Sequence, residues 1–210
     1  MGNMKKILPL IASMAIILVA GIFASAGTMA WFSDTEKSYN NTIIAGSLDL
    51  KVDGDDTNVV KITIENWSPG HGPYLYTYEI KNTGTIKGYL DLSKVEVIDY
   101  ENGLIEPERE AGDTSGGNPG KGNGELSSVL RMHMFVDNDP ANGWYGSEDV
   151  TIYNGPVNGV ASSYDLNLEI PAGGTTHITI QVGWWSTAND NLAQTDSLKL
   201  NIEFCLSQNP

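Results

Sequence analysis

Three aspartates in the second half of the chain, Asp137, Asp139 and Asp149, are the residues whose types best suit metal binding. They lie in a polar segment that also contains asparagine and glutamate. Calcium takes several oxygen ligands, and loops rich in Asp and Asn supply them. The spacing differs from that of an EF-hand loop, so two interpretations stay open: a calcium site, or an acidic loop that is simply solvated. No other cofactor is expected.

The residue types needed for catalysis are scattered along the sequence. The three histidines, His71, His133 and His177, lie far apart, and none belongs to the helical histidine pair with glutamate that zinc proteases use. No Gly-x-Ser-x-Gly motif occurs, and Cys205 has no histidine near it in sequence. A lone cysteine cannot form an internal disulfide, and its place in an alternating apolar segment indicates a structural thiol. We therefore predict that the chain is not an enzyme.

The charge balance narrows the classes of partner. The chain carries 12 basic and 26 acidic side chains, for a formal net charge of −14. Nucleic-acid binding depends on Lys and Arg against phosphate, and anionic lipid surfaces attract basic segments, so both partners are disfavoured. An acidic surface favours solubility and is compatible with cation binding. We predict no nucleic-acid partner and no docking on an anionic lipid surface.

The first 26 residues have the order of a secretory signal. Lys5 and Lys6 precede an apolar run without charged residues, and the run ends in small residues at Ala26. We predict a signal peptide over residues 1–26, cut by a signal peptidase between Ala26 and Gly27. The mature chain is then secreted and works outside the cell or at its surface.

Two alternatives stay open for this leader. An apolar run of about 20 residues can span a bilayer, so an uncleaved leader would make the membrane a partner through this segment alone. A leader of the type IV pilin kind would be cut before the apolar run, beside a glycine, but Lys6–Pro9 contains none. Cleavage at Ala26 leaves a free apolar N-terminus, Gly27–Asp34, which we expect to be the working part of the protein.

Apolar residues that alternate with polar ones predict β-strands along most of the remaining chain. The expected strands are residues 47–52, 60–64, 74–80, 89–97, 130–136, 150–153, 166–170, 178–184 and 198–206. The turn Pro171–Gly174 predicts a hairpin between two of them. Asp99–Leu126 is expected to be a long exposed loop with a short helix near Pro107, and Asp137–Asp149 a second polar loop. Many short strands predict one all-β domain, residues 41–210, folded as an antiparallel β-sandwich with long decorated loops and preceded by the apolar signal segment.

Two sequons for N-glycosylation occur, at Asn40 and at Asn66. They matter for an exported chain, in which a modified asparagine marks exposed surface. Chance sequons are common, so glycosylation and an unmodified surface asparagine are both compatible with the sequence.

Several segments together resemble the TasA/camelysin family of exported fibre proteins. The most specific is the junction of Trp31–Glu36 with Asn41–Val52, where a Phe-polar-Asp step is followed by an Ala-Gly-small-Leu-Asp-Leu strand. Three further segments fit the pattern: Tyr78–Thr85 after Ser68–Gly70, the turn segment Ile170–Thr175, and the ending Leu200–Phe204. The middle of the chain, Asp99–Val160, departs from it.

The resemblance implies a jelly-roll-like sandwich that polymerises outside the cell by donor-strand exchange, as family fibres including archaeal bundling pili do. Residues 27–40 would form the donor segment, with Met29, Trp31 and Phe32 as anchors in a neighbouring copy. The partner would then be the chain itself, joined head to tail. Some relatives carry a metallopeptidase label, but this sequence does not show the residues for it. A cell-surface metallopeptidase and a membrane-anchored monomeric adhesion domain are the alternative functions.

Overall fold

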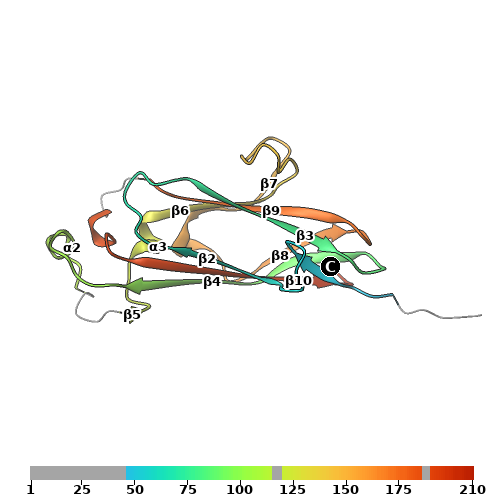
Figure 1. Ribbon diagram of the computed structural model, residues 1–210, viewed down its shortest axis with the longest axis horizontal. Helices are drawn as coiled ribbons and strands as arrows, with labels where there is room; N and C mark the ends of the chain where they lie inside the picture. The colour runs from blue at the N-terminus through green and yellow to red at the C-terminus, as the bar shows by residue number, and fades with distance from the viewer. Residues whose placement is uncertain (1–45, 115–119, 186–189) are drawn as a thin grey trace, which may run out of the picture. The chain divides into compact units, whose positions relative to one another are not determined.

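The computed structural model describes residues 46–114, 120–185 and 190–210, which form two antiparallel sheets packed face to face (Figure 1). The first sheet has the order β1-β3-β9-β6-β7: β1 (Leu50–Val52), β3 (Tyr74–Asn82), β9 (Thr175–Trp184), β6 (Leu130–Val136) and β7 (Val150–Pro156). The second has the order β2-β10-β4-β5, with β8 also beside β4: β2 (Val59–Ile64), β10 (Ser197–Ser207), β4 (Gly88–Glu101), β5 (Gly120–Lys121) and β8 (Tyr164–Ile170). The predicted antiparallel β-sandwich is confirmed.

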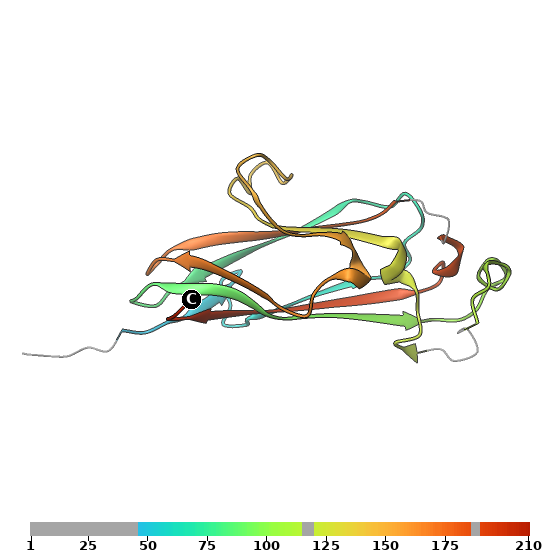
Figure 2. The same cartoon turned by 180° about the vertical axis from the view of Figure 1, so that it is seen from behind.

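Short helical turns connect the strands. They are α2 (Glu106–Ala111), α3 (Leu126–Val129), η2 (Val157–Gly159) and η3 (Asp190–Leu192). α2, α3 and η3 lie at the end of the sandwich where β4 ends, and η2 joins β7 to β8 (Figures 1 and 2). Among the described residues, no helix has both the length and the apolar character required to cross a membrane.

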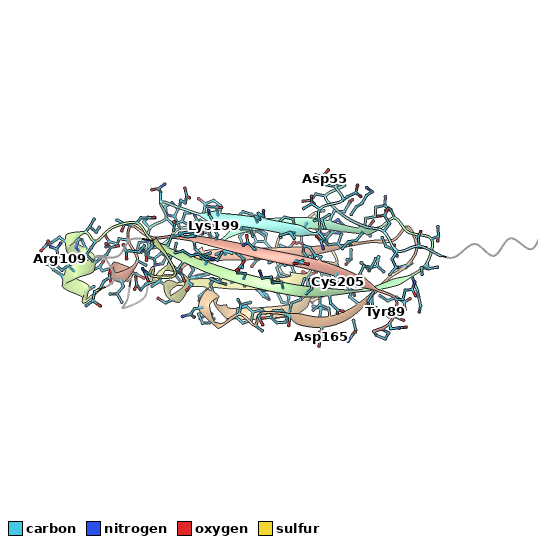
Figure 3. The ribbon with its side chains drawn as sticks, turned by 90° about the horizontal axis from the view of Figure 1, so that it is seen from below. Asp55, Tyr89, Arg109, Asp165, Lys199 and Cys205 are labelled. Carbon is cyan, nitrogen blue, oxygen red and sulfur yellow. The ribbon has the colours of Figure 1, made fainter. Side chains whose placement is uncertain are left out.

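The core lies between the two sheets and follows from the alternation of the strands. Along β10, Leu198, Leu200, Ile202 and Phe204 are fully buried, since every second side chain of a strand points to the same face. The other face of the second sheet carries polar side chains and Cys205 (Figure 3). Cys205 is exposed, so the thiol predicted to be structural lies on the outer face of β10 and not in the core.

The predicted strands are found, with changes at their ends. β4 runs to Glu101, beyond the expected end at residue 97, because β10 pairs with it along almost its whole length. β1 is shorter than the expected strand 47–52. Ser47 and Asp49 accept backbone hydrogen bonds from the β3–β4 connection without forming regular strand.

The predicted hairpin across Pro171–Gly174 is wrong. β8 pairs with β4 in the second sheet, whereas β9 pairs with β3 and β6 in the first, so this turn carries the chain between the sheets. The buried Asn82 holds the crossing: its backbone pairs with Gly173 and Gly174, and its Nδ2 donates to Ile170 O at 3.2 Å. The local sequence identified the turn but not the sheets that its flanking strands join.

The expected exposed loop Asp99–Leu126 is largely structured. β4 continues into it, β5 pairs with the end of β4, and α2 is the short helix expected near Pro107. Glu101, Glu108 and Asp113 are buried there. The acidic, glycine-rich composition of this segment predicted an exposed loop. The segment is instead covered by residues that lie before β10, and these are too far away in sequence for the local composition to indicate them.

Candidate functional site

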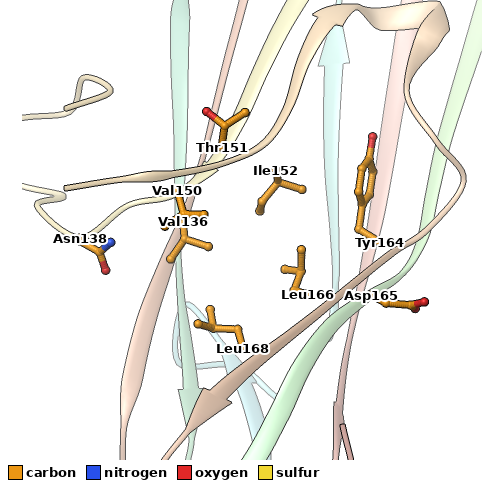
Figure 4. Close-up of a pocket in the computed structure, with 9 residues that line it drawn as sticks. All are labelled: Val136, Asn138, Val150, Thr151, Ile152, Tyr164, Asp165, Leu166 and Leu168. Carbon is orange, nitrogen blue, oxygen red and sulfur yellow. The ribbon is translucent and has the colours of Figure 1, made fainter. Parts of the chain in front are cut away.

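An apolar cleft opens between the edge strands of the two sheets, and we call it the β7–β8 cleft (Figure 4). β7 is the last strand of the first sheet, and β8 flanks β4 in the second. The cleft has a volume of about 420 Å³. Its apolar lining is Val136, Val150, Ile152, Tyr164, Leu166 and Leu168.

The side chains that line the cleft are less covered than the rest of the sandwich interior. Tyr164, Leu166 and Leu168 of β8 face the sandwich interior but are only half-buried, whereas Ile170, the last residue of the same row, is fully buried. Val150 at the start of β7 is 59% exposed. In the corresponding row of β10, four consecutive inward-facing side chains are fully buried, from Leu198 to Phe204, so the core of the described structure is less complete at the β8 edge.

The same two strands offer open backbone edges. Within the described residues, β7 pairs only with β6, and β8 pairs only with β4. The free edge of a strand presents unpaired N–H and C=O groups, which form a template for another extended segment. The β7–β8 cleft therefore combines two open edges with an apolar floor, which is a geometry suited to β-strand addition.

The predicted calcium loop is organised by its own hydrogen bonds. Asp137 is buried, and its Oδ2 accepts a 2.6 Å hydrogen bond from Thr179 Oγ1 while its Oδ1 accepts from the backbone N–H of Asp139. Asp149 accepts from two backbone N–H groups of the same loop, including that of Asn138 at 2.7 Å. In the described structure these aspartates do not gather their oxygens into one compact ligand group. Calcium binding by this loop stays a prediction.

The three histidines lie in separate places. His71 Nδ1 contacts the Ser68 hydroxyl, His133 Nε2 lies 2.9 Å from Thr151 Oγ1, and His177 lies 4.0 Å from a carboxylate oxygen of Glu79. Burial lowers the pKa of His133 below its ordinary value, which favours the neutral ring, and this ring packs at a tilt against Phe135 and Tyr145. Within the described residues the histidines form no common site.

The N-terminal predictions lie outside the described residues. This applies to the cleavage pair Ala26 and Gly27, to the sequon at Asn40, and to the donor anchors Met29, Trp31 and Phe32. Asn66, the second sequon, is exposed two residues after the end of β2 and has a left-handed backbone with φ 58°. Its side chain is accessible, and its glycosylation stays a prediction.

Comparison with known proteins gives one match. The family model described as camelysin metallo-endopeptidase matches residues 4–116, just over half of the chain. No curated protein and no solved structure gives a match. The matched range covers β1 to β4 and α2, whereas β7 and β8 lie beyond it.

Proposed function

The chain belongs to the camelysin family, and from this membership and the open cleft we propose that it is a secreted structural subunit of an extracellular filament. The N-terminal segment of one copy, freed by signal cleavage, enters the β7–β8 cleft of the next copy. This proposal accounts for an apolar N-terminus and for an apolar cleft in one chain. It assigns the protein no catalytic role.

The observation that carries the proposal is the incomplete edge of the sandwich. Leu166 and Leu168 point between the sheets but remain half-exposed, and the edges of β7 and β8 have no further strand in the described structure. An added strand would supply ladder hydrogen bonds and side chains for the apolar floor at the same time. A strand bound in an ordinary surface groove would make either the ladder hydrogen bonds or the apolar side-chain contacts, but not both.

The N-terminal segment has the residues that such a cleft requires. In an extended backbone Met29 and Trp31 share one face, since side chains alternate with period two. Burying each of them contributes about 1.5–3 kcal/mol. Ladder hydrogen bonds add about 0.5–1.5 kcal/mol each.

The point at which the N-terminal segment is attached, together with the position of the cleft, favours a chain of subunits. The described chain begins beside β1, at one edge of the first sheet, and the cleft lies at the β7 edge, across three intervening strands. The N-terminal segment is therefore attached to the described chain at the edge of the first sheet opposite to β7. A head-to-tail contact of this kind extends into a filament when its rotation does not close a ring.

Deletion of Gly27–Asp34 from the mature chain tests the proposal. The truncated protein should remain soluble and monomeric in light scattering, and electron microscopy should show no threads. The matched control is Trp31→Phe, which keeps an aromatic anchor and should still give threads. Threads of normal appearance from the truncated protein would contradict the proposal.

The family description also names a metallo-endopeptidase, which requires a catalytic metal. Zinc peptidases use histidine ligands and keep one coordination position open to substrate. The described histidines are dispersed. Within the described part of the chain, the compact group of potential ligands is Glu101, Asp113 and Glu125, of which the first two are buried. These residues do not fit a catalytic zinc site. Stoichiometric zinc together with chelator-sensitive cleavage of casein would favour the peptidase over a purely structural subunit.

A further inference from the structure

The outer face of the first sheet, which points away from the core, is partly covered. Along β6, Met134 and Val136 belong to the core, so Phe135 between them points outward, yet it is fully buried. The segment between β6 and β7 stands on this outer side of the sheet (Figures 1 and 2). Its Tyr145 packs edge-on against Phe135, with 5.3 Å between the ring centroids. This segment therefore forms a rim on the β6 side of the outer face.

A second aromatic ring lies on the same face at the end of β9. Gly183 stands between the core residues Val182 and Trp184, so a side chain there would point outward. The ring of Trp185 fills that space, because a Cβ at Gly183 would lie 3.0 and 3.1 Å from two atoms of the indole ring. Trp185 and Tyr145 nevertheless remain 48% and 45% exposed. Each ring therefore keeps a large area for a partner.

Gln181 of β9 lies on this face next to both rings. It is the cross-strand neighbour of His133, whose ring packs on Tyr145 with 4.5 Å between centroids. It also precedes Gly183 by two residues. Cross-strand neighbours are about 4.5–5.5 Å apart at Cβ, and residues two apart along a strand are about 7 Å apart. One ring therefore covers the neighbour of Gln181 across the sheet, and Trp185 covers its neighbour along the strand.

The side-chain amide of Gln181 has an unused hydrogen-bond donor. The residue is 9% exposed, and its Nε2 makes no hydrogen bond within the described residues. Other polar side chains of this face are already engaged: Thr179 donates its hydroxyl to Asp137. His133 Nε2 lies 2.9 Å from Thr151 Oγ1. A buried donor without an acceptor is unfavourable, so a ligand that supplies an acceptor to this recessed amide gains a hydrogen bond.

Exposed rings beside a recessed amide suit a ligand that has both apolar faces and hydrogen-bond acceptors. A sugar ring has C–H groups on its faces, which pack on aromatic rings, and hydroxyl groups at its edge, which accept from an amide N–H. Ligand sites commonly combine aromatic side chains with a few polar groups that fix the orientation of the ligand. A lipid chain would leave the amide of Gln181 without an acceptor.

The charge of the chain selects among polymers of sugars. With 26 acidic and 12 basic side chains, the molecule repels acidic polysaccharides and nucleic acids. Acidic residues also lie close to the rings, since Asp139 and Glu148 are exposed in the segment that carries Tyr145. An uncharged polysaccharide meets no such repulsion and offers the same ring faces and hydroxyl groups.

We propose that Trp185, Gln181, His133 and Tyr145 form a binding site for an uncharged polysaccharide on the outer face of the first sheet. Sugar rings pack on Trp185 and Tyr145, and Gln181 donates to a hydroxyl group between them. The site does not use the apolar floor of the β7–β8 cleft, and it does not depend on the proposed filament.

Binding of uncharged glycans to the full chain tests the site. An array of uncharged oligosaccharides, together with the polymers laminarin, dextran and hydroxyethyl cellulose, is screened first. Glycans that bind are then titrated by tryptophan fluorescence and calorimetry, with alginate as the acidic counterpart. At least one uncharged glycan should bind with a Kd below about 1 mM, and alginate should bind about tenfold more weakly or not at all.

Two variants locate the ligand. Trp185→Ala and Gln181→Leu should each weaken glycan binding about tenfold or more. Gln181→Leu should not lower Tm, because it removes a buried donor that has no acceptor, whereas a purely structural role of Gln181 would lower Tm. Tyr89→Ala removes a ring from the outer face of the second sheet (Figure 3), and this matched control should bind normally. If Gln181→Leu does not fold, Trp185→Ala decides, since its side chain is half-exposed.

Four results would overturn the proposal. They are the absence of binding to every uncharged glycan tested, unchanged affinity in both site variants, an equal loss of affinity in Tyr89→Ala, and a Trp185→Ala variant that changes only the association of protein chains. The last would make this face a contact between proteins instead of a glycan site.

Discussion

A charge placed in the β7–β8 cleft should stop assembly without unfolding the subunit. Leu166→Asp replaces a half-buried side chain of the cleft floor. A donor strand that covers this position loses about 1.5–3 kcal/mol of apolar burial, and covering a carboxylate costs more again. A total of about 3 kcal/mol raises the critical concentration for thread formation roughly a hundredfold, since each 1.4 kcal/mol is a factor of ten.

The subunit itself should change little, because Leu166 is already partly in contact with water. We expect its free energy of unfolding to fall by about 1 kcal/mol, or a few degrees in Tm. The matched control is Thr63→Asp, which adds the same charge to an exposed position of the edge strand β2. Sedimentation and electron microscopy across a concentration series measure both variants. Normal assembly of Leu166→Asp, or equal inhibition by Thr63→Asp, would refute the assignment of the cleft.

Three further outcomes are expected. Asn82→Ala should lower the free energy of unfolding, measured by urea titration, by about 2–4 kcal/mol. The substitution removes the side-chain amide that donates hydrogen bonds to the carbonyl of Ile170 and to a second main-chain carbonyl. An unchanged midpoint of the urea titration would contradict this prediction. Thr179→Val removes the hydroxyl that donates a hydrogen bond to the buried Asp137 and should lower the free energy of unfolding by about 1–3 kcal/mol. An unchanged free energy of unfolding would show that this hydrogen bond does not stabilise the fold. Mass spectrometry of the exported protein should place its N-terminus at Gly27, and an intact leader would favour a membrane-anchored protein.

The fold class was predictable because the alternation of apolar and polar residues along a strand indicates which side chains are buried. The sequence predicted one buried strand face near the end of the chain, and the structure confirms it: Leu198, Leu200, Ile202 and Phe204. The pairing of strands was not predictable in the same way. Pro171–Gly174 has the composition of a hairpin turn, yet the chain changes sheets there because the buried Asn82 and the long β4 offer better partners.

The candidate sites depend on position in the sheets more than on local sequence. Tyr164, Leu166 and Leu168 alternate just as the core rows do, but they lie on an edge strand and line the cleft, which leaves them half-buried. The buried carboxylate of Glu108 is held by Thr195, which lies far away in sequence. The available signal was an excess of acidic over basic residues between Asp99 and Leu126, which predicted solvation instead of burial.

The most direct test joins the N-terminal segment of one copy to the cleft of another through a disulfide. In a Cys205→Ser background, one chain carries Ser33→Cys, which shares a strand face with Trp31, and a second carries Val150→Cys at the mouth of the cleft. A disulfide forms only when Cα atoms approach within about 4.4–6.8 Å. Oxidation of each variant alone measures the background yield of homodimers. In a second control, Thr63→Cys takes the place of Val150→Cys.

Mixing and oxidation should give mixed covalent dimers of the Ser33→Cys and Val150→Cys chains on a non-reducing gel, and none above background with Thr63→Cys. Absence of the mixed dimer, or an equal yield with Thr63→Cys, would contradict the account. So would a chain carrying both Ser33→Cys and Val150→Cys that closes only on itself.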